Sequence, residues 1–152
     1  MSTVAVTSGL GALPSRFRRE RLLIVGYGDV GQRMARNLLT GPGAQRLRVL
    51  ALTSQAERVG SLRAQGVTPL VGNLDHAATL RRLSGLATRV VHLAPPPGEG
   101  GGGAAWWRDP RTVALARALR LRSLPVSLVY ASTSGVYGDC AGALVAETRP
   151  VA

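Results

Sequence analysis

The sequence predicts an α/β fold in which helices cover both faces of a doubly wound parallel sheet. From residue 21 onward, short apolar runs alternate with stretches of helical periodicity, which is the pattern of repeated strand–helix units. The run LLIV at residues 22–25 is apolar at every position, as a strand covered on both faces must be. A glycine-rich turn follows that strand directly and leads into an amphipathic stretch. These three observations together carry the prediction of the fold class.

The glycine turn has the spacing GxGxxG and is the most informative motif in the chain. Gly26 lets the chain turn out of the strand, Gly28 keeps the backbone accessible to a pyrophosphate, and Gly31 lets the next helix pack closely on the strand. That helix presents free N–H groups and a partial positive charge to the phosphates. The motif therefore predicts a dinucleotide site, whereas the alternative is that the glycines only tighten the turn. The residues between the glycines belong to the same predicted site: Tyr27, Asp29 and Val30.

The remaining elements continue the alternation of strand and helix. Further strands are predicted at residues 48–52, 68–71, 89–93 and 125–131, and further helices at 56–65, after residue 75, and at 110–122. Right-handed connections between them give five strands in the order 3-2-1-4-5. A ligand should therefore bind at the carboxyl ends of the strands, near the point between strands one and four where the direction of winding reverses.

Two of the helices carry more specific expectations. Val30, Met34 and Leu38 recur at helical spacing after the glycine turn, so they are expected to form the stripe that packs on the sheet. Asp75 is expected to cap the helix that follows the third strand. The residues that this helix is expected to bury are Leu80 and Leu83.

Composition limits the kinds of function. With 152 residues the chain is about one domain, divided here into a flexible leader at 1–20 and a folded domain at 21–152. It has no apolar run long enough for a membrane span, and its single cysteine, Cys140, fits a reducing cytoplasm. The net charge of +11 is scattered and aromatic residues are few, which argues against nucleic-acid binding. His76 and His92 have no partners at metal-ligand spacing, so no metal site is expected.

The residues that follow the second strand indicate which dinucleotide is bound. An NAD site usually has an acidic residue there, which binds the ribose hydroxyls. This chain has Thr53 and Ser54 instead, with Arg58 just beyond them. Hydroxyls and an arginine would bind the 2′-phosphate that a carboxylate would repel, so NADP is favoured over NAD. The alternative for Arg58 is a solvated position on a helix.

Polar residues also follow the third and fifth strands. Asn73 and Leu74 could contact adenine through a side-chain amide and a backbone N–H, although Asn73 is equally suited to a turn. Residues 129–139, VYASTSGVYGD, bring hydroxyl groups to the end of a buried strand. Such hydroxyls can hydrogen-bond a substrate carbonyl or alcohol. The alternative is a polar turn that satisfies backbone groups at the strand end.

Three motifs together resemble the extended and atypical short-chain dehydrogenase/reductases of the NAD-dependent epimerase/dehydratase type. They are GYGDVG at 26–31, APPP at 94–97 and YASTSGVYGD at 130–139, and the resemblance runs from about Arg21 to the last residue. It implies a Rossmann fold in which Ala94 and Pro95 line the ribose and phosphate of the cofactor. It also implies that the hydroxyl of Thr133 hydrogen-bonds the substrate oxygen. The complete protein would transfer a hydride between NADP(H) and a carbonyl or hydroxyl carbon of a small molecule.

The chain departs from that family in its catalytic residues. The family carries a YxxxK pair on the helix after this motif, where the lysine lowers the pKa of the tyrosine, but this sequence contains no lysine, and Tyr137 belongs to the VYG turn. We therefore expect a truncated cofactor-binding half, inactive alone, whose exposed fifth strand favours self-association. The alternatives are a regulatory nucleotide-sensing module of the kind that gates potassium channels, whose GYGxVG start is similar, and a nonfunctional gene fragment.

Overall fold

The computed structural model describes residues 20–97, 109–131 and 137–150. The strands form a parallel sheet in the order β3-β2-β1-β4-β5, so the predicted doubly wound α/β fold is confirmed. The strands are β1 (Glu20–Val25), β2 (Leu47–Thr53), β3 (Thr68–Val71), β4 (Arg89–His92) and β5 (Ser127–Tyr130). The α-helices are α2 (Asp29–Thr40), α3 (Val59–Ala64), α4 (Ala77–Leu80) and α5 (Pro110–Leu119). Short 3-10 turns are η1 (Ala44–Arg46), η2 (Ala56–Arg58) and η3 (Arg81–Leu83).

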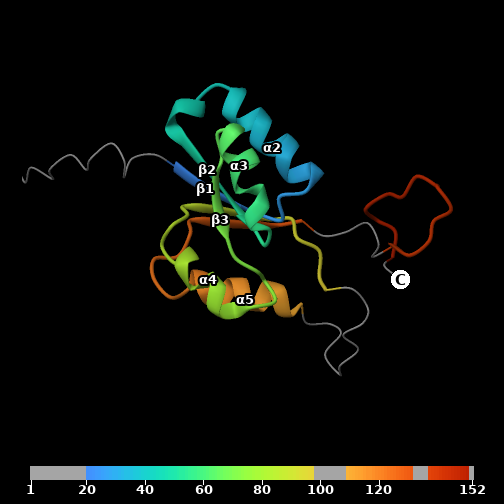
Figure 1. Cartoon of the computed structure of the whole chain (residues 1–152). Coiled ribbons are helices and arrows are strands. Elements are labelled where there is room, and N and C mark those ends of the chain that lie inside the picture. Colours follow the sequence, from blue (N-terminus) through green and yellow to red (C-terminus); the bar gives the residue numbers. More distant parts are fainter. Residues whose placement is uncertain (1–19, 98–108, 132–136, 151–152) are drawn as a thin grey trace, which may run out of the picture.

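Helices cover both faces of the sheet, with α2 and α3 on one face and α4 and α5 on the other (Figure 1). Because successive side chains of a strand point to opposite faces, β1 supplies Leu22 and Ile24 to one core and Leu23 and Val25 to the other. All four of these side chains are at most 6% exposed. The continuous apolar run that predicted a central strand is thus explained by burial on both sides.

The predicted buried stripe of α2 is partly wrong. The helix buries Gly31 and Ala35, while Met34 and Leu38 pack at the margin of the core. Val30 is 64% exposed. The reason lies in the glycine turn: the absence of a side chain at position 31 lets this position face the strand directly, which rotates Val30 toward the carboxyl ends of the strands.

The predicted helix cap at Asp75 is also wrong. The residue before α4 is His76, and no side chain caps this helix. Asp75 instead forms an ion pair with Arg111 of α5. The expected burial of Leu80 and Leu83 is confirmed, since both are fully buried.

Several predicted elements differ from the observed ones at their ends. The predicted helix at 56–65 is divided into the turn η2 and the helix α3, and α5 ends at Leu119 rather than at residue 122. The predicted start of this helix at residue 110 is confirmed, and Pro110 occupies its first position. Residues 137–150 contain no long helix or strand.

β5 forms an edge of the sheet. It pairs with β4 on one side, and its Leu128, Val129 and Tyr130 side chains are 44%, 57% and 43% exposed. The predicted exposed edge is therefore confirmed. Apolar side chains just before the strand are exposed as well: Leu121, Leu124 and Val126. None of the helices in residues 20–97 and 109–131 combines the length and the apolar character needed to cross a membrane.

Candidate functional site

A cleft of about 510 Å³ opens at the carboxyl ends of the strands. The chain moves from β1 to β2 on one side and later returns to β4 on the other side. In open parallel sheets this reversal is where ligands bind. Every residue predicted to bind the cofactor lines this cleft: Gly26, Tyr27, Gly28, Asp29, Val30, Gly31, Thr53, Ser54, Arg58, Asn73, Leu74, Ala94 and Pro95. The predicted catalytic residue Thr133 lies outside the described residues.

The three glycines of the turn differ in what they contribute. Gly26 has a φ of +91°, and a Cβ at this position would lie 2.4 Å from the backbone nitrogen of Ala94. A Cβ on Gly31 would lie 2.9 Å from the carbonyl oxygen of Gly26. A Cβ on Gly28 would meet no atom within 4 Å. Gly26 and Gly31 are thus required by the fold, whereas Gly28 borders open space that fits a ligand approaching the backbone.

The N-terminus of α2 faces the same space. Gly28 precedes the helix and provides no side-chain cap, so the first N–H groups remain available for an anion. Asp29 in the first turn forms an ion pair with Arg33, with the carboxylate oxygen 2.9 Å from Nε. Its carboxylate stabilises the helix dipole but places a negative charge beside the anion site. An anion bound at this N-terminus would be attracted by the backbone N–H of Asp29 and repelled by its carboxylate.

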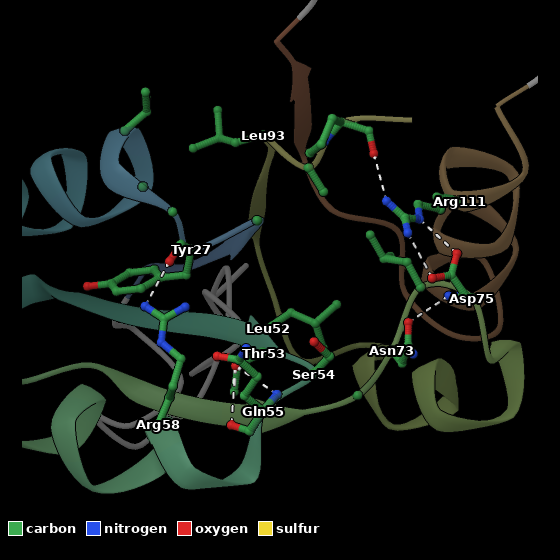
Figure 2. A pocket seen from close by; sticks show the side chains of 18 of the residues that line it. Tyr27, Leu52, Thr53, Ser54, Gln55, Arg58, Asn73, Asp75, Leu93 and Arg111 are labelled. Carbon is green, nitrogen blue, oxygen red and sulfur yellow. Dashed lines mark hydrogen bonds and ion pairs between the residues drawn. The ribbon is translucent and has the colours of Figure 1, made fainter. Parts of the chain in front are cut away.

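The side chain of Tyr27 lies away from the cleft (Figure 2). It is 3% exposed and packs in the core beside α2 and α3, where its hydroxyl donates to Oε1 of Gln65 at 3.2 Å. Burial raises the pKa of Tyr27, while the positive charges of Arg58 and Arg36 act in the opposite direction. The carbonyl oxygen of Tyr27 accepts a hydrogen bond from Nη2 of Arg58 at 3.1 Å. Tyr27 thus offers the cleft backbone atoms and an anchor for Arg58.

The end of β2 carries hydroxyl groups and no acid. The Thr53 hydroxyl accepts from the backbone N–H of Gln55 at 3.2 Å and donates to its carbonyl oxygen at 3.3 Å, so it is satisfied locally. Ser54 is exposed at the cleft. Arg58 is half-buried, and the ion pairs found among the described residues do not include it. The guanidinium is therefore held at the rim of the cleft by a neutral carbonyl and not by an ion pair with a described residue.

The end of β3 forms a tight turn. Oδ1 of Asn73 accepts from the backbone N–H of Asp75 at 2.9 Å, and the backbone N–H of Asn73 donates to the hydroxyl of Thr79 at 2.9 Å. Asn73 therefore has the turn role that the sequence offered as one of two interpretations. It also lines the cleft together with Leu74.

Sequence reasoning missed an ion pair that bounds one end of the cleft. Arg111 donates from Nε and Nη2 to the two carboxylate oxygens of Asp75 at 2.7 and 2.8 Å, and from Nη1 to the carbonyl oxygen of Pro95 at 3.1 Å (Figure 2). These hydrogen bonds lower the pKa of Asp75 and raise the pKa of Arg111. The partners lie 36 and 16 residues from Arg111, so no local spacing in the sequence could have revealed the pair.

His92 lies beside the cleft in a buried polar chain. It is fully buried, and its Nε2 is 3.0 Å from the hydroxyl of Thr112. That hydroxyl donates to the carboxylate of Asp109, so it accepts from Nε2–H and leaves Nδ1 of His92 unprotonated. Burial lowers the pKa of His92, and the charge of Asp109 opposes this effect. Within the described ranges, no group of three His, Cys, Asp or Glu side chains is arranged to hold a metal ion.

Comparison with known proteins agrees with this geometry. Residues 22–94, which include the glycine turn and the four strand ends around the cleft, match the model of the TrkA-N domain. The chain has the Rossmann fold, and the family model covers just under half of it. Among curated proteins, no sequence matches this Rossmann domain.

Solved structures with the same fold include epimerases. A functionally unknown conserved protein from Silicibacter pomeroyi is 26% identical, with a TM-score of 0.58 over 88% of this chain and 42% of that chain. A putative epimerase from Burkholderia cenocepacia is 24% identical, with a TM-score of 0.63 over 89% and 45%. The Helicobacter pylori ADP-L-glycero-D-manno-heptose-6-epimerase is 18% identical, with a TM-score of 0.60 over 88% and 46%. The Rossmann domain therefore spans less than half the length of these structures.

Proposed function

We propose that this Rossmann domain binds NADP(H) in preference to NAD(H). The observation that carries the proposal is the arrangement of Arg58 at the end of β2, where NAD-preferring sites have an acid. Its Nη2 is fixed on the Tyr27 carbonyl at 3.1 Å, and the exposed neighbour, Ser54, brings a hydroxyl instead of a carboxylate. A preorganised guanidinium with remaining donors suits a phosphate on the adenosine ribose.

The other predicted residues would divide the remaining parts of the dinucleotide between them. The backbone at Gly28 and the first turn of α2 would hold the pyrophosphate. Asn73 and Leu74 would contact the adenine, and Ala94 and Pro95 would line the ribose and phosphate of the cofactor. Because β4 lies on the opposite side of β1 from β2 and β3, these two residues would face the nicotinamide half. When bound, the cofactor would supply a hydride donor or acceptor, and the protein would supply its orientation.

We also propose that the domain is the cofactor-binding half of a cytoplasmic short-chain-type oxidoreductase or sugar-nucleotide epimerase/dehydratase. The resemblance of its motifs to that family and the epimerases among its structural neighbours support this assignment. In such a protein Thr133 would hydrogen-bond the oxygen of the substrate. Because the sequence contains no lysine, these 152 residues lack the YxxxK pair and are expected to have little or no activity alone.

Isothermal titration of NADPH and NADH tests the cofactor proposal. Arg58→Ala should weaken NADPH binding about tenfold, the value of one hydrogen-bonded ion pair, and leave NADH binding within about twofold. Arg63→Ala is the matched control, because Arg63 is an exposed arginine on α3 that lies outside the cleft. Equal affinities of the wild-type protein for NADPH and NADH would overturn the preference.

The match to the TrkA-N model favours a second function, a regulatory module that senses nucleotides. Such a module would respond to NADH or ATP rather than to NADPH. The absence of an acid at residues 53–55, directly at the end of β2, argues against it. Preference for NADH or ATP in the same titration would support the regulatory function.

A further inference from the structure

Arg111 joins three segments of the chain that lie far apart in the sequence. It belongs to the first turn of α5, Asp75 follows β3, and Pro95 follows β4. The guanidinium uses three of its nitrogens, two on the Asp75 carboxylate and one on the Pro95 carbonyl. The Arg111 side chain is only 25% exposed. A bidentate, partly shielded pair of this kind fixes orientation as well as distance.

The two segments that Arg111 holds border different parts of the cleft. Asn73 and Leu74, just before Asp75, line it at the end of β3, and Ala94, just before Pro95, lines it at the end of β4. In the binding mode proposed above, the first segment would contact the adenine half of NADP(H) and the second the nicotinamide half. A side chain that fixes one segment relative to the other therefore sets the spacing between the two halves of the site.

We propose that Arg111 is a positioning residue that holds the adenine and nicotinamide halves of the cleft in register, through Asp75 and the Pro95 carbonyl. This inference rests on the proposed function and deepens it. Arg111 could also strengthen binding simply by attracting an anionic cofactor. Because Arg111 and Asp75 carry opposite charges, neutralising Asp75 has opposite effects on affinity under these two roles. If Arg111 acted by attraction, neutralising Asp75 would strengthen binding, because a negative charge near the cofactor would be removed. If Arg111 acts by positioning, neutralising Asp75 weakens binding, because the two segments are no longer held together by the ion pair.

The test is the titration of NADPH into Arg111→Lys and Asp75→Asn. Arg111→Lys keeps the charge but loses the planar fork, so both variants should bind NADPH about fivefold more weakly, and the double variant should bind no more weakly than either single variant. Arg117→Ala, which removes an exposed arginine from the same helix, is the control and should bind like the wild-type protein. Tighter or unchanged binding of NADPH by Asp75→Asn would overturn the proposal.

A second ligand sharpens the distinction. The adenine half of the cofactor, 2′,5′-ADP, needs only one of the two segments. Its affinity should therefore fall less than about twofold in both variants. An equal loss of affinity for NADPH and 2′,5′-ADP would place the effect in the adenine subsite alone. It would overturn the proposal that Arg111 holds the two halves of the cleft in register.

Hydrogen exchange tests the positioning in the ligand-free protein. The amides of residues 73–76, which include the His76 N–H that donates to the Asn73 carbonyl at 3.0 Å, should exchange at least about threefold faster in both variants. The amides of β1 should be unaffected. Unchanged exchange at 73–76 would overturn the inference, whereas a wild-type protein that binds no NADPH would overturn the proposed function alone.

Discussion

Replacing the glycines of the turn by alanine separates the residue that serves the ligand from the residue that serves the fold. Gly28 has a φ of −82° and a ψ of −157°, which alanine adopts without strain, and its Cβ would meet no atom within 4 Å. Gly28→Ala should therefore change the free energy of unfolding by less than about 1 kcal/mol, as the reduced entropy of the unfolded chain opposes the poorer helix cap. The new methyl group points into open space where the pyrophosphate is proposed to lie. NADPH binding should fall at least about tenfold.

Gly26→Ala should have the opposite result. A φ of +91° costs an alanine about 1–2 kcal/mol, and the contact of 2.4 Å with the backbone nitrogen of Ala94 cannot be relieved by a side-chain rotation. The loss should reach at least about 3 kcal/mol in the free energy of unfolding, which lowers the melting temperature by about 10 °C for a domain of this size. Urea unfolding and isothermal titration on both variants measure the two effects. A Gly28→Ala variant that binds NADPH like the wild-type protein would refute the argument, because it would show that all three glycines only tighten the turn.

Three other perturbations give distinct results. Asp29→Asn should tighten NADPH binding about twofold to threefold at low salt, because it removes a negative charge beside the proposed pyrophosphate site. Thermal unfolding should show a less stable protein, since the carboxylate no longer stabilises the dipole of α2. Unchanged affinity at low salt would contradict this expectation. Because burial lowers the pKa of His92, the unfolded chain binds its proton first, so stability should fall by up to about 1.4 kcal/mol per pH unit as the pH drops below about 6.5. Urea unfolding should show a flatter profile in His92→Gln, whereas the exposed-site control His76→Gln should match the wild-type profile. We also propose that the β5 edge mediates self-association. Sedimentation should then show concentration-dependent oligomers of the wild-type protein, and Val129→Lys should abolish them. A monomeric wild-type protein would contradict the proposal.

The sequence was sufficient for the fold because the central strand β1 is buried on both faces. A run such as 22–25 has no alternation of polar and apolar residues, and only a covered strand or a buried helix segment tolerates that. The glycine turn removed the ambiguity, since it placed a chain reversal directly after the run. The same turn located the cleft, because the carboxyl ends of parallel strands meet at one edge of the sheet.

The errors occur where a long-range contact decides the local structure. Helical periodicity grouped Val30 with Met34 and Leu38. It could not show that Gly31 packs so closely that a Cβ added to it would lie 2.9 Å from the Gly26 carbonyl oxygen, and this close approach selects the buried face. Cap propensity favoured Asp75 as the start of a helix. The bidentate pair with Arg111 uses that carboxylate instead.

The missed pair also shows why a site has more determinants than its motif. The motif residues supply the groups that would face a dinucleotide, and each was found from its position after a strand. What keeps those strand ends at a fixed spacing is a contact between residues 75, 95 and 111. Residue 75 belongs to the unit of β3 and α4, whereas residues 95 and 111 belong to the unit of β4 and α5. Arg111 lies in the first turn of a helix that begins with Pro110 and buries Leu115, Ala118 and Leu119. The role of Arg111 becomes visible only when α5 is packed against the sheet. Substitution of Arg111 should therefore weaken cofactor binding although every residue of the nucleotide-binding motif is unchanged.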